Sequence, residues 1–168
     1  YHFTNWTGDV SGGQETQNPL QLTMSTPKSI EAHFSLNMTT SAPVAVPELW
    51  LAGFGLTEDF EDEVLDDADE DGALTWQEYV MDTDPTNRHS VLSLDTGSSQ
   101  GAGYMLHWFA STERIYALYM STNQPGVVTN ALFTGFQPDE TGTATYTDAV
   151  HSVNERIYYR VKVAFPEE

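Results

Sequence analysis

The sequence contains no cysteine. This absence excludes disulfide bonds and thiol catalysis together, and it is ordinary in a bacterial secreted protein. No run of apolar residues is long enough to cross a bilayer, so we expect no membrane insertion. The chain opens on Tyr1 rather than Met and shows no signal peptide, so we expect a processed product or an excised piece.

Basic residues are also scarce. Six Lys and Arg stand against twenty-five Asp and Glu, which gives a net charge of -19. This charge argues against nucleic acid and against anionic membrane surfaces as partners. Thirteen of the acids lie between Glu58 and Asp84, while no base lies between Lys28 and Arg88. Because such crowded like charges repel, we expect folding of this region to depend on a bound divalent cation.

Catalytic motifs are missing as well. None of the five histidines stands at metal-ligand spacing from another, and the sequence has no His-Glu-x-x-His, Gly-x-Ser-x-Gly or Gly-x-x-x-x-Gly-Lys motif. Carboxylate pairs for acid–base work remain, but the acids are concentrated where metal ligation explains them better. We therefore expect a protein that is not an enzyme.

The most informative positive feature is the stretch of residues 67–78. Oxygen-bearing side chains stand at the first, third, fifth, ninth and twelfth positions, and the sixth is Gly72. This is the spacing of an EF-hand loop, in which calcium takes six to eight oxygens and the glycine permits the sharp turn. The alternative is an acidic, solvated loop. We predict calcium as the cofactor, with five side-chain ligands, Thr75 among them acting through water, and one backbone carbonyl ligand, that of Ala73: Asp67, Asp69, Asp71, Ala73, Thr75, Glu78.

Hydropathy patterns divide the chain into modules. Residues 1–36 read as a β-hairpin formed by 20–24 and 30–36, with a further strand at the aromatic start of the chain. Residues 37–46 read as an extended Thr/Ser/Pro linker.

The remaining residues divide between a helical and a β module. Residues 47–87 are predicted to form three helices: one that begins at Pro47, one at 58–65 and one at 75–81. Residues 88–168 predict short strands, the first at 90–94, in a small β-sandwich. The expected fold class is mainly β with a small α calcium-binding insert.

The first module has a familiar spacing. The aromatic residues Tyr1, Phe3 and Trp6, a Gly-rich turn, and Lys28 before the alternating Ile30 strand resemble the divergent internalin-type B repeat. That resemblance implies about two more strands before the aromatic one. Three explanations for their absence stay open: an arbitrary cut, strands that are disordered or cleaved, or a strand supplied by a neighbouring copy.

The later modules also resemble known ones. Residues 47–87, with Trp50, the acidic loop and the Thr83–Asn87 turn, resemble calcium-binding tails related to dockerin and thrombospondin type-3 repeats. A dockerin proper carries two loops and this chain has one, so the resemblance does not imply cohesin docking. Residues 88–168, ending in a Tyr158–Val161 strand, resemble a fibronectin-III-like module for which no activity is implied.

Together these features predict a secreted, non-catalytic structural or adhesive protein of the bacterial cell surface. We expect a subunit of a fibre or layer that self-associates as a homopolymer by β-strand exchange. The alternative is an ancillary C-terminal region of a secreted carbohydrate-active enzyme, or a carbohydrate-binding module with glycan partners. Asn5 and Asn37 head N-x-Thr triplets and are candidate glycosylation sites.

Overall fold

The computed structural model describes residues 1–98, 103–123, 130–151 and 156–166. The chain divides into two compact units, Tyr1–Leu65 and Asp66–Glu168. Within the described residues, eight strands form three antiparallel sheets and three short helices complete the structure. The prediction of a mainly β protein is confirmed. No helix in the described ranges is long and apolar enough to span a membrane.

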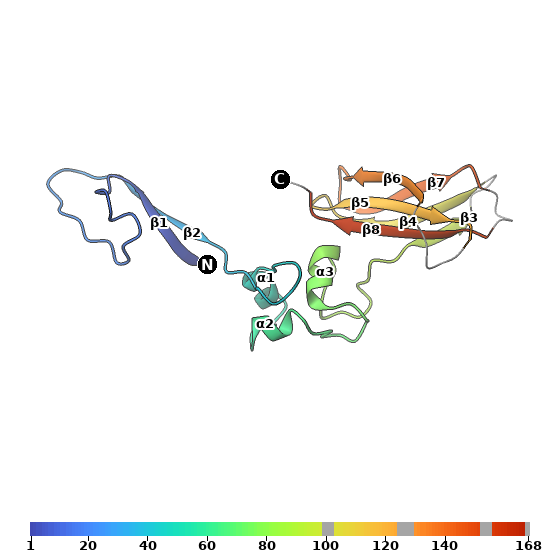
Figure 1. Ribbon diagram of the computed structural model, residues 1–168, viewed down its shortest axis with the longest axis horizontal. Coiled ribbons are helices and arrows are strands. Elements are labelled where there is room, and N and C mark those ends of the chain that lie inside the picture. The colour runs from blue at the N-terminus through green and yellow to red at the C-terminus, as the bar shows by residue number, and fades with distance from the viewer. Residues whose placement is uncertain (99–102, 124–129, 152–155, 167–168) are drawn as a thin grey trace. The chain divides into compact units, whose positions relative to one another are not determined.

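The first unit begins with a two-stranded sheet (Figure 1). Strand β1 (His2–Gly8) pairs antiparallel with β2 (Ile30–Ser35). The strand predicted at 20–24 is absent: Leu20 and Leu22 are partly buried, but Met24 is 67% exposed and no described strand pairs with this stretch. Instead, residues 9–29 form an irregular connection. Trp6 holds it through its backbone N–H on Glu15 O (2.7 Å) and its indole N–H on Gln17 O (2.7 Å).

Residues 37–46, expected to be extended and exposed, form a closed loop. The Thr39 N–H donates to Val46 O (2.9 Å), and the Val46 N–H donates back to the Thr39 hydroxyl (3.0 Å). Both residues are buried. The Glu61 carboxylate accepts the backbone N–H groups of Thr40 and Ser41 and lies outside the loop in sequence. The Thr/Ser/Pro composition is typical of a linker. The prediction was wrong because composition does not reveal the hydrogen bonds that close this loop.

Two helices follow in the same unit. Helix α1 (Glu48–Gly53) begins directly after Pro47, as predicted from the preference of proline for helix starts. Helix α2 (Phe60–Glu63) is shorter than the predicted 58–65, and the Asp59 carboxylate caps its first N–H groups. Val46, Leu51 and Val64 are fully buried in this unit.

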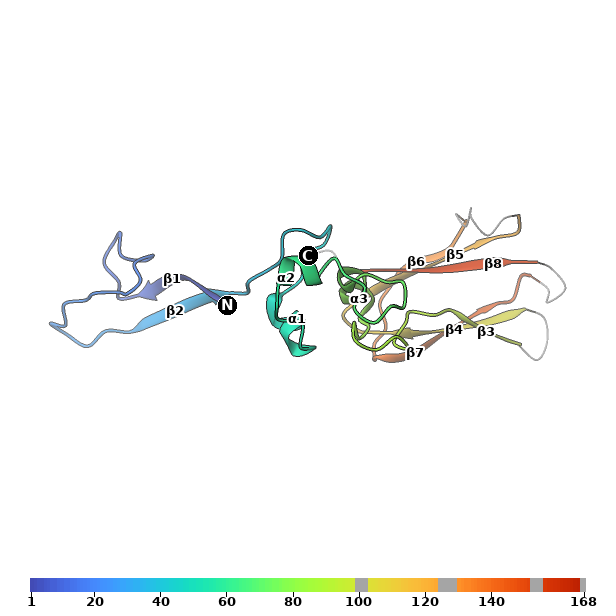
Figure 2. The same ribbon diagram turned by 90° about the horizontal axis from the view of Figure 1, so that it is seen from below.

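The second unit contains helix α3 (Thr75–Met81), found where predicted, and two three-stranded sheets. One sheet has the order β3-β4-β7 and the other β6-β5-β8, and they form two layers (Figure 2). The strands are β3 (Asp95–Ser98), β4 (Tyr104–Ala110), β5 (Ile115–Ser121), β6 (Asn130–Phe136), β7 (Gly142–Asp148) and β8 (Tyr158–Ala164).

Two strand predictions in this unit need correction. The strand expected at 90–94 is not formed, and β3 begins instead at Asp95. Leu92 and Leu94 nevertheless pack on the core, which explains their alternating pattern. Strand β6 was not predicted.

Side chains from both sheets share one core. Trp108 and Ala110 of β4 and Tyr116 of β5 are buried at its centre. The Trp108 ring stacks against Phe133 of β6 with ring centroids 6.0 Å apart. Strand alternation places these residues inward, and burial of the large aromatic rings contributes hydrophobic stabilisation to this unit.

Candidate metal-binding site

Three aspartates of the predicted loop converge. One carboxylate oxygen from each of Asp67, Asp69 and Asp71 lies within 4.8 Å of the other two. All three side chains are partly buried. Three like charges at this spacing repel one another, and a bound cation would offset that repulsion.

Backbone hydrogen bonds shape the loop. The Asp71 N–H donates to Asp67 Oδ1 and to Asp69 Oδ1, both at 3.1 Å, and the Gly72 N–H donates to Asp67 Oδ2 at 2.9 Å. Gly72 has a φ of +100°, a left-handed conformation that a side chain would strain. The turn that the glycine permits therefore helps to bring the three carboxylates close together.

The start of α3 positions the end of the loop. The Leu74 N–H donates to Gln77 Oε1 (2.8 Å), which satisfies one of the free N–H groups of the first helical turn. The N–H and the hydroxyl of Thr75 both donate to Asp66 O, at 2.9 and 3.0 Å. The hydroxyl proton of this predicted ligand is thus engaged within the protein, while its oxygen lone pairs remain able to accept.

Glu78, the predicted last ligand, is fully buried on α3. Its Oε1 accepts the Thr83 hydroxyl at 3.4 Å, whereas its Oε2 has no hydrogen-bond partner. Burial, and then the negative charges of Asp69, Asp71 and Asp67, raise the pKa of Glu78 to about 7. A buried carboxylate oxygen without a partner is costly, and Asp69 Oδ2 is in the same situation.

These observations test whether the residues present fit a calcium ion. The donors are carboxylate oxygens, which calcium prefers, and two of these oxygens are buried without a partner. The Ala73 N–H donates to Asp71 Oδ1 at 2.7 Å, so this residue lies close to the cluster. The three aspartates fit the ion, whereas the predicted ligand Glu78 is not among the carboxylates that lie within 4.8 Å of one another. Bound there, calcium would supply positive charge and structural cross-linking rather than a reaction.

Arg114 joins α3 to the sheets of the second unit and was not predicted as important. Its side chain is 4% exposed. Its Nε and Nη2 donate to the carbonyls of Val80 (2.9 Å) and Tyr79 (2.7 Å) at the C-terminal end of α3. The guanidinium also lies 4.2 Å from the ring centroid of Phe165, just after β8. A cation at a helix C-terminus is favourable, so Arg114 holds the helix that carries Glu78.

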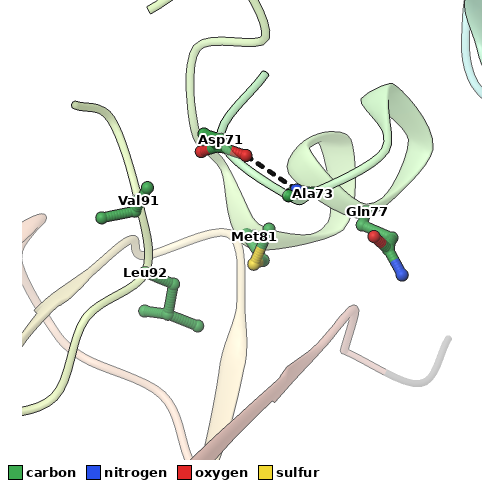
Figure 3. A pocket seen from close by; sticks show the side chains of 7 residues that line it. Asp71, Ala73, Gln77, Met81, Val91 and Leu92 are labelled. Atoms are coloured by element: carbon green, nitrogen blue, oxygen red, sulfur yellow. Dashed lines mark hydrogen bonds between the residues drawn. The ribbon is translucent and has the colours of Figure 1, made fainter. Parts of the chain in front are cut away.

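A pocket of about 390 Å³ lies beside the acidic loop (Figure 3). Its lining combines loop, helix and the segment before β3: Asp71, Gly72, Ala73, Gln77, Met81, Val91, Leu92. In Figure 3 the Asp71 carboxylate accepts the Ala73 N–H at the edge of this pocket. The loop is therefore bordered by a hollow on the α3 side.

A second buried carboxylate lies at the end of β7. Asp148 accepts the hydroxyl of Tyr159 (2.8 Å), is 2.8 Å from His151 Nδ1, and accepts the backbone N–H of Val150 (3.0 Å). Burial opposes its ionisation, but the hydrogen bonds from Tyr159 and His151 outweigh that effect and lower the pKa of Asp148. Val150 and His151 follow Asp148 closely in the sequence, but the Tyr159 hydroxyl comes from β8, and this contact has no local sequence pattern.

The two candidate glycosylation sites lie in the first unit. The Asn37 amide donates to Glu48 Oε2 (2.9 Å), and Thr39 of the same triplet is buried. Asn5 is partly buried on β1, with its amide 3.4 Å from Trp6 O. Both sites stay predictions.

Comparison with known proteins bears on the first module alone. A family model for the divergent InlB B-repeat domain matches residues 1–38 of the 168-residue chain, which confirms the predicted resemblance of that segment. Domains of this family are typical of bacterial surface proteins. No curated protein sequence and no solved structure matches the chain.

Proposed function

We propose that this chain is a calcium-stabilised, non-catalytic structural or adhesive protein of the bacterial cell surface. In this proposal the loop of residues 67–78 is an EF-hand-like site related to dockerin and thrombospondin type-3 loops. The two sheets of the second unit are then a fibronectin-III-like sandwich that the ion stiffens. Copies associate through β-strand addition to build a fibre or layer.

The single observation that carries the calcium site is the group of carboxylates around Asp69. One oxygen from each of three aspartates lies within 4.8 Å of the other two, and the partnerless oxygens of Asp69 and Glu78 are buried near like charge. Without a cation the carboxylates repel one another, and the buried Asp69 Oδ2 and Glu78 Oε2 have no hydrogen-bond partner, so both effects are unfavourable. One bound divalent ion relieves both effects.

Strand addition is supported by the small first sheet. Among the described residues no third strand pairs with β1 or β2. A lone pair of strands is marginally stable and offers free N–H and C=O groups at its edges. Phe34 of β2 is 60% exposed and Tyr1, just before β1, is 69% exposed, so apolar side chains lie near the edges to which a strand could be added.

The test of the calcium site is calorimetric unfolding with calcium, with magnesium and with chelator. We expect calcium to raise the unfolding temperature of the Asp66–Glu168 unit and chelator to remove that increase. Extracellular calcium modules bind at roughly 10⁻⁴ to 10⁻³ M, so millimolar calcium should saturate the site. Unfolding that is the same in calcium and in chelator contradicts the proposal.

Assembly is tested separately by electron microscopy and light scattering of the whole chain. Regular filaments or sheets support strand addition. Particles of monomer size at every protein concentration contradict it, and they leave the calcium result standing on its own.

A further inference from the structure

The sheet β6-β5-β8 is free of acidic residues. None of its three strands contains Asp or Glu, although the chain has twenty-five of these residues. Two of the six bases of the chain, Arg160 and Lys162, lie in β8, and both are exposed. In the part of the chain that the structure describes, neither has a carboxylate within ion-pair distance. This sheet is therefore a local cationic surface on a strongly anionic protein.

Strand register gathers the two bases around an aromatic ring. Arg160 lies opposite Tyr119 of β5, and Lys162 lies opposite Ala117. Since the intervening Leu118 is fully buried, alternation places Tyr119 and Ala117 on the outer face. The Lys162 ammonium lies 4.7 Å from the centroid of the Tyr119 ring. Cations and ring thus share one face of one sheet.

The same face is hollowed. The register between β5 and β6 shifts at Leu118, and Gly135 of β6 has a φ of +70°. A side chain at this glycine would meet no atom within 4 Å. A pocket of about 280 Å³ lies here, and small residues line much of it, including Ala117, Thr134 and Ala164.

We propose that this pocket binds an acidic sugar, a pyranose ring that carries a carboxylate or a sulfate. The ring lies on Ala117 and against Tyr119, where apolar C–H groups contact the aromatic face. The anionic group lies at Lys162, which lines the pocket, on the side toward Arg160. Arg160 stands two residues along β8, outside the lining, and a guanidinium binds planar carboxylates in a bidentate manner. The Thr134 hydroxyl is available to a sugar hydroxyl.

A ring fits this surface better than an acidic peptide does. The lining combines the small residues Ala117, Gly135 and Ala164 with two tyrosines, Tyr116 and Tyr119, which suits the flat face of a ring. The site shares no residue with the acidic loop, so it goes beyond the proposed function and can fail independently of it.

The experiment is isothermal titration calorimetry of the whole chain with oligosaccharides of equal length. One is carboxylated (oligogalacturonate), one is a sulfated galactan and one is a neutral galactan. Lys162→Gln and Arg160→Gln each remove one exposed charge from the site. Arg88→Gln removes the same charge from an exposed turn elsewhere in the second unit and is the matched control. Ala117→Leu fills the pocket without changing charge.

We expect at least one acidic oligosaccharide to bind, and the neutral one to bind much more weakly. Losing one charge-assisted contact should weaken binding about tenfold in Lys162→Gln and in Arg160→Gln. Arg88→Gln should change binding by less than about twofold. Whichever acidic sugar binds more tightly identifies carboxylate or sulfate as the recognised anion.

Several results would overturn the proposal. One is that neither acidic sugar binds, and another is that the neutral sugar binds as tightly as the acidic ones. A third is that Arg88→Gln weakens binding as much as Lys162→Gln and Arg160→Gln do. Unchanged binding in all variants would place the sugar elsewhere, for example on calcium at the acidic loop. Displacement of bound sugar by a poly-glutamate peptide of equal charge at equal concentration would instead indicate an acidic protein partner. Matching unfolding midpoints establish that Ala117→Leu is folded, and unchanged binding in it then counts against the pocket.

Discussion

At the residue scale, the acids of this chain differ by environment rather than by type. Glu78 and Glu70 lie in the same loop, but Glu78 is fully buried whereas Glu70 is exposed. The spacing of the loop predicts that Glu78 is a ligand and that Glu70 is not, because ligands stand at fixed positions of such loops. It could not predict Asp148, whose partner Tyr159 comes from another strand. Contacts between distant residues leave no local pattern.

Glu78→Gln should separate calcium binding from folding. The change removes a buried negative charge that Asp69 and its neighbours oppose, so the calcium-free protein should be as stable as the parent or more stable. Calcium affinity should fall about tenfold or more, since the last ligand of such loops supplies two oxygens. Titration calorimetry and thermal unfolding with and without calcium measure both effects.

Glu70→Gln is the matched control, because it removes the same charge from an exposed position of the loop. It should leave the calcium-induced rise in unfolding temperature nearly unchanged. Equal losses in both variants would mean that overall charge, rather than ligation by Glu78, attracts the ion.

The lowered pKa of Asp148 leads to a prediction of how the free energy of unfolding depends on pH. Its pKa is lower in the folded chain than in the unfolded chain, so its stabilisation is present above the unfolded value and is lost as pH falls through the folded value. Tyr159→Phe removes one hydrogen bond to this carboxylate and should cost about 1.5–3 kcal/mol at neutral pH. Urea unfolding at neutral pH, and again below the pKa of Asp148, should show this cost shrinking with acidification. Tyr158→Phe, one residue away, is the control, and an equal pH-dependent loss there would contradict the assignment.

At the element scale, prediction succeeded where local signals decide. Pro47 marks the start of α1, and the apolar spacing of residues 75–81 marks α3. Prediction failed for β6, because Gly135 and a bulge interrupt the alternation of apolar and polar residues in this strand. It also assigned a strand to residues 20–24, where alternation occurs without a partner strand. Alternation is a necessary sign of a half-buried strand, but pairing decides whether one forms.

Arg114 offers a test of how α3 is held. Arg114→Met keeps most of the apolar stem and removes the donors to the carbonyls of Tyr79 and Val80. Leaving these groups without a partner should destabilise the second unit by about 2–4 kcal/mol. It should also weaken calcium binding, because Glu78 lies on the released helix. Urea unfolding followed by tryptophan fluorescence measures the first effect, and calcium titration measures the second.

Arg88→Met makes the same change on an exposed turn and should cost less than about 0.5 kcal/mol. If Arg114→Met lowers stability while calcium affinity is retained, Arg114 supports the sheets alone and does not position the loop.

At the scale of the whole molecule, the sequence predicted a mainly β chain with a short helical region, but not which elements share a core. The division after Leu65 falls inside residues 47–87, which the sequence suggested as one module. Periodicity reports the local state of a segment, whereas a compact unit depends on contacts between segments. The sequence also could not show that one sheet contains no acidic residue, because strand order decides which strands belong to the same sheet.

The proposed assembly makes a prediction about β2. Phe34→Lys places a charge on an exposed apolar position of this strand, a device by which natural edge strands avoid pairing. We expect filaments or higher oligomers to disappear in light scattering and electron microscopy. Leu49→Lys makes the same change at an exposed position of α1 and should leave assembly intact. Loss of assembly in both variants would indicate non-specific apolar association.

The closed loop between Thr39 and Val46 has a practical consequence for dissecting this chain. A protease must draw an extended stretch of backbone through its cleft, and hydrogen bonds pin this loop to itself and to Glu61. Limited digestion should therefore cut within the irregular residues 9–29 well before it cuts within 37–46. A fragment that ends inside the Thr/Ser/Pro stretch would expose the buried Val46, and so the apparent linker is an unsuitable place to divide the protein.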